Sequence, residues 1–161
     1  MEDEQLPEIS NFQASISLID ENKPLKFCNA RPVPVHRKDL INIELDALEK
    51  QGVITPICAS NHGSPVVLVA KKNNRYRMCV YFKSTLNGNI KSDAYPLPTI
   101  EEVFAKIGNS CIFVKVDLKS AYWQIGLDEK AKNVSVINTS KGLYRLNRLQ
   151  MVPSFKNAWS K

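Results

Sequence analysis

The apolar residues of this chain fall in short runs separated by polar turns, and one run has a clear helical period. Between residues 37 and 52, Ile41, Leu45 and Leu48 recur at a spacing of four and three residues, and Gly52 follows them. This spacing places the three side chains on one face of a helix, and a glycine is the usual residue just after a helix end. The sequence therefore predicts a helix over residues 37–52.

A second helix is predicted from Thr99 to about Ile107. Pro98 suits the first turn of a helix, and Gly108 suits the position just after its end. Four apolar side chains share one face of this helix: Ile100, Val103, Phe104 and Ile107. We expect that face to pack against the rest of the protein.

Several other runs have the length and composition of strands. The β-branched run from Ser64 to Ala70 predicts a buried strand, and the alternating run from Arg75 to Val80 predicts its hairpin partner across a turn at 71–74. Further predicted strands are 53–55, 111–116, 123–127, 134–139 and 143–146, the last two forming a hairpin around 140–142. A mixture of hairpins and helices in this order indicates an α+β fold.

Charge is distributed unevenly along the chain, whose net charge is +6. Residues 1–22 hold six acidic and no basic residues, so the remainder has 22 basic against 10 acidic residues. No Asp or Glu follows Glu129. A basic body of this kind suits a polyanionic partner, nucleic acid first, although a soluble basic domain without such a partner fits equally well. We interpret residues 1–24 as an acidic tail or linker, with a short strand near 15–19.

The sequence argues against several other classes of protein. The four cysteines lie far apart and have no histidine pair nearby, so we expect neither a zinc site nor a disulfide framework. No apolar run is long enough to cross a bilayer, and the acidic N-terminus lacks the basic and apolar regions of a secretory signal. We therefore expect an intracellular protein with no membrane partner.

Two groups of residues offer candidate chemistry before any family is considered. Asp117 stands at the end of a predicted apolar strand, where a carboxylate can hold a metal ion, although most such aspartates only cap the next turn. Four cations surround the tip of the predicted hairpin: Lys71, Lys72, Arg75 and Arg77. They can clamp phosphates, or they can simply keep an edge hairpin soluble.

Seven blocks in one order carry a resemblance to a known family. They are FCNARPVP (27–34), EKQGVI (49–54), SPVVLVAKK (64–72), RMCVYFKSTLN (77–87), DAYPLPTIEEVFAKI (93–107), VDLKSAYWQIGLDE (116–129) and NTSKGLYRLNRL (138–149). Together they resemble the reverse transcriptase of gypsy-type retrotransposons with long terminal repeats. The resemblance covers residues 25–149 as a reverse transcriptase region and leaves 150–161 as a divergent end.

The resemblance implies the right-hand architecture of a polymerase, here the fingers and a truncated palm. It implies template-directed nucleotidyl transfer with two Mg²⁺ ions, RNA or DNA template-primer as partner and deoxynucleoside triphosphates as substrates. Asp117 matches the first catalytic aspartate, and Leu118 would offer its carbonyl oxygen to the metal site.

For the incoming nucleotide, the resemblance implies contacts to the triphosphate and to the sugar. Lys71 or Lys72 and Arg77 match the fingers residues that contact the triphosphate, and Arg77 would also pack on the base. Ser120 and Ala121 would line the pocket. Tyr122 matches the aromatic steric gate that excludes a 2′-hydroxyl.

Three departures from the family pattern bear on activity. Tyr81 stands where a structural aspartate is usual in the family, and we expect the loss of that aspartate to loosen the fingers. The segment Leu149–Phe155 lacks the usual Pro-Gly turn. The Tyr-x-Asp-Asp segment, which supplies the other metal-binding carboxylates of the family, is absent from these residues.

These departures leave three hypotheses about function. We expect a reverse transcriptase fragment that is inactive alone, because one aspartate cannot hold two divalent cations. The alternative is a non-catalytic, basic nucleic-acid-binding relic. A third possibility is association with an intact polymerase subunit. Analogy with the family places the chain in the cytoplasm. The sheet would expose an unpaired edge, so we also expect marginal stability and aggregation.

Overall fold

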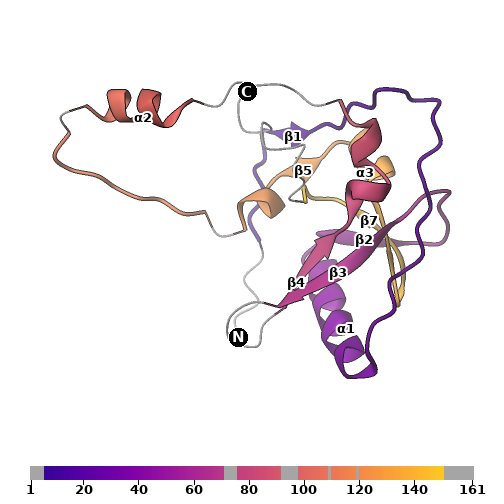
Figure 1. Cartoon of the computed structure of the whole chain (residues 1–161). Coiled ribbons are helices and arrows are strands. Elements are labelled where there is room, and N and C mark those ends of the chain that lie inside the picture. Colours follow the sequence, from indigo (N-terminus) through magenta and orange to yellow (C-terminus); the bar gives the residue numbers. More distant parts are fainter. Residues whose placement is uncertain (1–5, 71–75, 92–97, 109, 119, 151–161) are drawn as a thin grey trace.

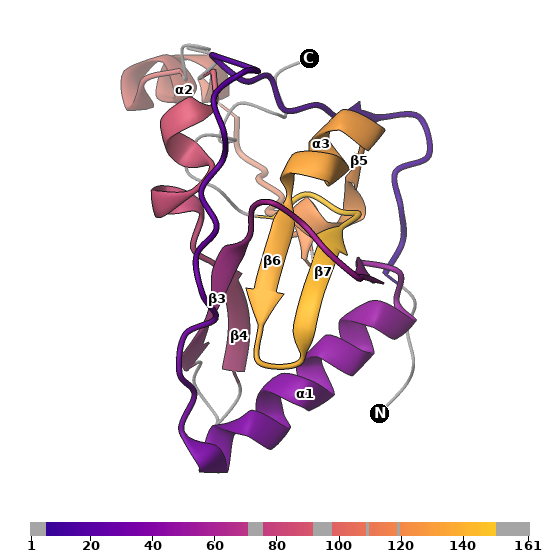
Figure 2. The ribbon, with the colours of Figure 1, turned by 90° about the vertical axis from the view of Figure 1, so that its right-hand side faces the viewer.

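A five-stranded sheet and one long helix form the body of the protein in a computed structural model, which describes residues 6–70, 76–91, 98–108, 110–118 and 120–150. The sheet has the order β2-β7-β6-β3-β4, and helix α1 (Val35–Lys50) runs obliquely across it (Figure 2). The strands are β2 (Ile54–Ile57), β3 (Ser64–Ala70), β4 (Tyr76–Val80), β6 (Val136–Thr139) and β7 (Gly142–Leu146). The α+β fold predicted from the sequence is confirmed.

Helix α1 follows from its sequence pattern. Ile41, Leu45 and Leu48 are its buried residues, and they join the hydrophobic core. The helix ends as predicted, because Gly52 adopts a φ of 69° and donates its N–H to the carbonyl of Glu49 at 2.9 Å. A left-handed conformation at this position favours glycine, which has no Cβ to clash with the backbone. Its start at Val35 lies two residues before the predicted one.

Two hairpins and one short parallel contact build the sheet. β3 and β4 pair antiparallel from Val66 opposite Val80 to Ala70 opposite Tyr76, and the turn predicted at 71–74 lies outside the described residues. β6 and β7 form the second predicted hairpin. The hairpins meet where β3 runs parallel to β6, through Ser64 opposite Ile137 and Pro65 opposite Asn138.

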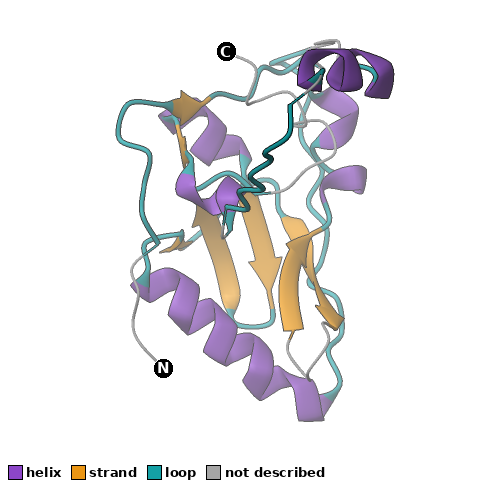
Figure 3. Cartoon of the chain, turned by 90° about the vertical axis from the view of Figure 1, so that its left-hand side faces the viewer, coloured by secondary structure: helices purple, strands orange, loops and turns teal. Residues whose placement is uncertain are grey.

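Smaller elements complete the body (Figure 3). They are the 3₁₀ turns η1 (Phe82–Ser84), η2 (Asn87–Asn89) and η3 (Ala121–Gln124), the two-residue strands β1 (Gln13–Ala14) and β5 (Gly126–Leu127), and helix α3 (Glu129–Val134). Helix α3 was not predicted from the sequence. Its signal was Asp128, whose carboxylate accepts the N–H of Ala131 at 2.7 Å and so caps the helix start.

The N-terminal segment, residues 6–31, wraps along the body rather than standing away from it as a tail would (Figure 2). β1 pairs in parallel with β5, and the side chains of Ala14 and Ile16 are buried in the core. Further along, the side-chain amide of Asn89 bonds with both the N–H and the carbonyl of Asp20. The alternation of Ala14, Ile16 and Leu18 is the sequence signal for this packing.

Helix α2 (Ile100–Ile107) and residues 110–118 stand away from the body (Figure 1), and we call residues 98–108 and 110–118 the arm. The α2 helix forms as predicted, with a capping box between Thr99 and Glu102. Its apolar face is not packed, since Phe104 is 68 % exposed. The strand predicted at 111–116 is wrong for this structure, because residues 110–118 form no strand and Ile112 is 86 % exposed.

The arm shows why an apolar run alone does not make a strand. A strand needs a neighbour to accept and donate its backbone hydrogen bonds. In the described part of the chain, the backbone of residues 112–118 makes no such bond. No described helix is long and apolar enough to cross a membrane. The large apolar side chains of the arm are exposed in this structure: Ile100, Val103, Phe104, Ile112, Phe113, Val114, Val116 and Leu118.

We predict that this surface makes the protein self-associate. Replacing Ile112 and Val114 by lysine should reduce binding of a hydrophobic dye and shift the concentration-dependent association, measured by sedimentation, toward the monomer. The control adds the same two charges at Asn22 and Asn29, which are exposed polar residues, and should change little. A wild-type chain that stays monomeric and binds no dye would contradict the prediction.

His62 links the loop before β3 to the end of α3. Its Nε2–H donates to the carbonyl oxygen of Asn133 at 3.0 Å. Burial lowers the pKa of His62 below its usual 6.5, against the opposing effect of the hydrogen bonds to Asn133 and Val134. The folded state therefore binds this proton less readily than the unfolded state.

We predict a loss of stability in acid from this histidine. As the pH falls below about 6.5, the unfolded chain gains the proton first, so the free energy of unfolding should decrease until the lower folded pKa is reached. Urea unfolding across this window should show a weaker pH dependence in His62→Gln than in the wild type. His36→Gln, at an exposed position on α1, should retain the wild-type dependence.

Candidate functional site

The candidate catalytic residue Asp117 lies near the end of the arm. Asp117 and Leu118 are both exposed. Among the described residues, no group of three His, Cys, Asp or Glu side chains is placed to hold a metal ion. A two-ion site needs several anionic ligands, and a single carboxylate with a backbone carbonyl does not fit that requirement.

The candidate nucleotide-pocket residues follow immediately, at a sharp turn into the body. Ser120 has a φ of 52° and is the single described residue other than glycine with a positive φ. Such a backbone is strained for serine and is common where a functional site constrains the chain. The turn leads into η3, where Ala121 is half-buried and Tyr122 packs against the hydrophobic core. The body thus positions Ala121 and Tyr122, whereas the arm holds Asp117 in solvent.

The fingers candidates lie on the β3–β4 hairpin. Arg77 is on β4, opposite Val69 of β3, and its side chain is exposed. Lys71 and Lys72 lie outside the described residues. An exposed arginine near the tip of a hairpin can reach an anionic ligand without losing an internal partner.

Backbone hydrogen bonds hold the strand that follows Tyr122 on both sides. The N–H of Leu127 donates to the carbonyl of Asn147, and the N–H of Leu149 donates to that of Ile125, both at 2.9 Å. On the other side, β1 runs alongside, and the N–H of Ile9 donates to the carbonyl of Gln124 at 2.8 Å. The N-terminal segment is therefore part of the support for η3 and Tyr122.

An ion pair closes over this strand. Arg148 Nη2 lies 3.0 Å from Glu8 Oε2, and the Arg148 side chain is only 11 % exposed. Gly126 makes room for the pair, because a Cβ at this position would come within 2.5 Å of Glu8 Oε1. Sequence reasoning missed this contact, since nothing in the local pattern relates residues 8 and 148.

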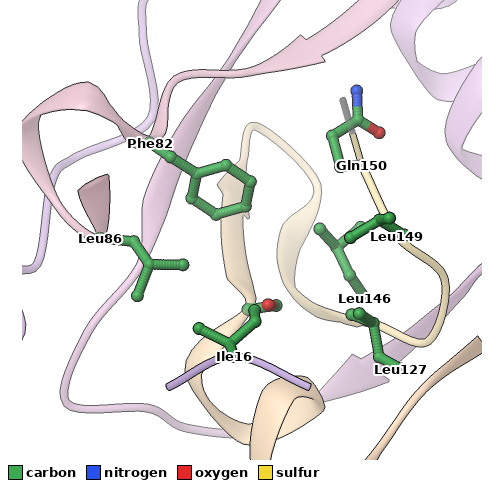
Figure 4. A pocket seen from close by; sticks show the side chains of 8 residues that line it. Ile16, Phe82, Leu86, Leu127, Leu146, Leu149 and Gln150 are labelled. Carbon is green, nitrogen blue, oxygen red and sulfur yellow. The ribbon is translucent and has the colours of Figure 1, made fainter. Parts of the chain in front are cut away.

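A cavity beside this region is small and mostly apolar (Figure 4). Its volume of about 10 Å³ is that of a single water molecule, too small for a nucleotide. It is lined by Ile16, Phe82, Leu86, Leu127, Ser135, Leu146, Leu149 and Gln150. These residues come from the N-terminal segment, η1 and the C-terminal strands, so the cavity marks where the three meet and offers no ligand site.

Tyr81, which replaces the aspartate usual in the family, has a cation for a neighbour. The guanidinium carbon of Arg31 lies 4.7 Å from the centroid of the Tyr81 ring. This geometry is that of a cation–π interaction. An aspartate at position 81 would have a cation, Arg31, close enough to pair with. The Tyr81 ring contacts the same cation through a cation–π interaction. The expected loosening of the fingers stays a prediction.

We predict that Gly126→Ala and Glu8→Gln destabilise the protein through the same contact. Glu8→Gln replaces the carboxylate by an uncharged amide, and Gly126→Ala pushes the carboxylate aside, so each should lower the free energy of unfolding by up to about 1 kcal/mol. Urea titration of the double variant should show much less than the sum of the two effects. Gly88→Ala is the matched control, because a Cβ there meets no atom within 4 Å. Equal effects of the two glycine substitutions would disprove the proposed crowding.

Comparison with known proteins gives relatives over most of the chain. It is 38 % identical over 132 residues to the uncharacterized protein K02A2.6 of Caenorhabditis elegans, covering 81 % of this chain and 10 % of that protein. It is 36 % identical over 142 residues to the transposon Tf2-3 polyprotein of Schizosaccharomyces pombe, covering 88 % of this chain and 10 % of the polyprotein. The chain thus spans about a tenth of the length of these relatives. No family model matches it.

Solved structures show which fold the chain shares. A prototype foamy virus protease-reverse transcriptase matches 98 % of this chain and 20 % of its own length, with a TM-score of 0.74 and 22 % identity. A foamy viral protease-reverse transcriptase in complex with double-stranded DNA matches 92 % of this chain and 28 % of its own, with a TM-score of 0.64 and 17 % identity. The chain is a homologue of one segment of retrotransposon polyproteins, and its fold is that of the matching segment of a viral protease-reverse transcriptase.

Proposed function

We propose that these residues are the fingers and part of the palm of an RNA-directed DNA polymerase encoded in a retrotransposon Pol polyprotein. The observation that carries the proposal is the agreement of two independent likenesses. Sequence similarity to a transposon polyprotein covers 88 % of the chain, and a reverse transcriptase fold covers 98 %. The same residues are thus related in both sequence and shape.

In this proposal the residues around the Ser120 turn form the pocket for a deoxynucleoside triphosphate. Ser120 and Ala121 line the nucleotide pocket, and the Tyr122 ring acts as a steric gate against a 2′-hydroxyl. The support is their placement, since the strand that directly follows η3 is held from both sides by β1 and residues 147–149. Lys71, Lys72 and Arg77 of the fingers hairpin contact the triphosphate.

Mg²⁺ supplies the chemistry in reverse transcriptases, where two ions activate the primer hydroxyl and stabilise the leaving group. Asp117 and Leu118 would contribute to such a site. These two residues do not supply enough ligands for two Mg²⁺ ions. The described residues place one carboxylate at Asp117, and no Asp or Glu follows Glu129 in these residues. We therefore propose nucleotidyl transfer by descent, with no polymerisation by this stretch alone.

A non-catalytic nucleic-acid-binding role is the second candidate. The basic charge outside residues 1–22 favours it, because phosphate contacts need no metal. One structural relative is a complex with double-stranded DNA. Both candidate functions therefore predict binding of a template-primer, and they differ only in whether the residues descend from a catalytic site that once transferred nucleotides.

Association with an intact polymerase subunit is a further part of the proposal. The exposed apolar residues of the arm favour a polypeptide partner over solvent. A subunit with a complete palm would offer both apolar contacts and strand edges to this arm.

We predict that the recombinant chain binds a primer–template with an affinity that falls steeply as salt increases, and that it extends no primer. Gel shift and primer extension measure the two properties on the same substrate. Asp117→Asn should leave binding unchanged, because Asp117 is not needed for phosphate contacts. Extension that Asp117→Asn abolishes would contradict the proposed inactivity, and absent or salt-insensitive binding would remove the nucleic-acid role.

A further inference from the structure

The arm contains a run of strand length whose two sides differ in chemistry. Residues 112–118 read Ile-Phe-Val-Lys-Val-Asp-Leu, and alternate residues of an extended chain point to opposite sides. One side would carry apolar residues alone: Ile112, Val114, Val116 and Leu118. The other side would carry Lys115 and Asp117 beside Phe113. Such alternation is typical of an antiparallel strand that buries one side and leaves the other in water.

The structure leaves this run open to a partner strand. Val114 is 83 % exposed and Val116 is 78 % exposed, and Lys115 and Asp117 are exposed as well. In the described part of the chain, the backbone of residues 112–118 makes no hydrogen bond, and no ion pair involves Lys115 or Asp117. Figure 1 shows the segment well away from the sheet of the body. Unpaired backbone groups on an exposed apolar run are a template for pairing with another chain.

Charge indicates that the partner strand is a second copy of this segment. If two copies pair antiparallel about Val116, Lys115 of each copy lies opposite Asp117 of the other, and Val114 lies opposite Leu118. Unlike charges directly opposite each other stabilise a strand pair, and like charges destabilise it. The segment is therefore complementary to itself in this register, on both its charged and its apolar side.

Other arrangements of the same two segments lose this complementarity. A parallel pair in register sets Lys115 against Lys115 and Asp117 against Asp117. An antiparallel pair shifted by one residue sets each charge against an apolar side chain, and a shift by two residues sets one of the charges against its own copy. The charges of this run thus select one register.

Helix α2 can cover the apolar side of such a pair. A two-stranded ribbon by itself is marginally stable in water and gains stability from a helix packed on it. The exposed face of α2 is apolar and belongs to the same arm: Ile100, Val103 and Phe104. Pairing of two copies would let this face and the apolar side of the strands bury each other.

We propose that two copies of this chain associate through residues 114–118, paired as antiparallel strands with a twofold axis at Val116 and one Lys115–Asp117 pair on each side of it. Both copies use the same residues, so the contact closes on itself as a dimer. The inference does not depend on the proposed polymerase descent, and it gives the self-association predicted from the arm a register. The strands pair only in the dimer, so residues 112–118 of the monomer stay unpaired.

Charge reversal at either position tests the register in the whole chain. Sedimentation equilibrium measures the dimer dissociation constant of Lys115→Glu and of Asp117→Lys. Each variant sets like charges opposite each other on both sides of the twofold axis, so association should weaken at least about fivefold. The variant with both substitutions restores unlike pairs and should associate within about twofold of the wild type. Both positions lie on the exposed arm, so circular dichroism should show a folded body in every variant.

A mixture of the two single variants separates pairing in this register from general stickiness. In the mixed dimer each charge of one copy again faces an opposite charge, so the mixture should associate at least about fivefold more tightly than either variant alone. Lys130→Glu and Asp39→Lys, at exposed positions on α3 and α1, make the same changes in net charge and are the matched controls. Each control should dimerise as the wild type does, and their mixture should show no preference.

Either of two results would overturn the inference. If both single variants dimerise as tightly as the wild type, or their mixture shows no gain, the arms associate through apolar contact without this register. If the wild type sediments as a monomer at all concentrations, the arm does not pair with a second copy, and a longer polymerase subunit becomes the occupant to test.

Discussion

The body depends on a short parallel contact between two hairpins. β3 and β6 share two residue pairs, and this contact joins β3–β4 to β6–β7 in one sheet. Side-chain bonds reinforce the junction, since the Asn138 amide donates to the carbonyl of Cys28 at 3.1 Å and Ser64 bonds with Thr85. Two parallel strands cannot be joined by a short turn and need a long connection between them. The strand order of the sheet therefore depends on this contact between strands that are distant in sequence.

The candidate site has one half that the body supports and one half that it does not. The N-terminal segment and residues 147–149 hold the chain after Tyr122 through backbone bonds on both sides. Residues 112–118 before Ser120 have no comparable backbone bonds among the described residues, and the apolar side chains of the arm remain in solvent. The fold therefore builds the turn at Ser120, which we propose faces the nucleotide, but the described residues form no sheet that would fix Asp117.

The sequence predicted those features that are encoded locally. The period of Ile41, Leu45 and Leu48, the glycine at 52 and the alternation in the hairpins each report a nearby backbone conformation. It did not predict contacts that join distant residues, such as Glu8 with Arg148 or Arg31 with Tyr81, because no local pattern encodes them. The strand predicted at 111–116 failed for a related reason, since its composition is right but the described residues supply no partner.

Hydrogen–deuterium exchange, read by mass spectrometry on peptides, tests the division between body and arm most directly. Amides held in backbone hydrogen bonds exchange slowly, with protection that reports local stability. We expect slow exchange in α1, in the strands of the sheet and in residues 125–127, which β1 and residues 147–149 flank. We expect rapid exchange at residues 112–118 of the monomer. Protection of residues 112–118 equal to that of the sheet would contradict it, because the segment carrying Asp117 would then be a paired strand.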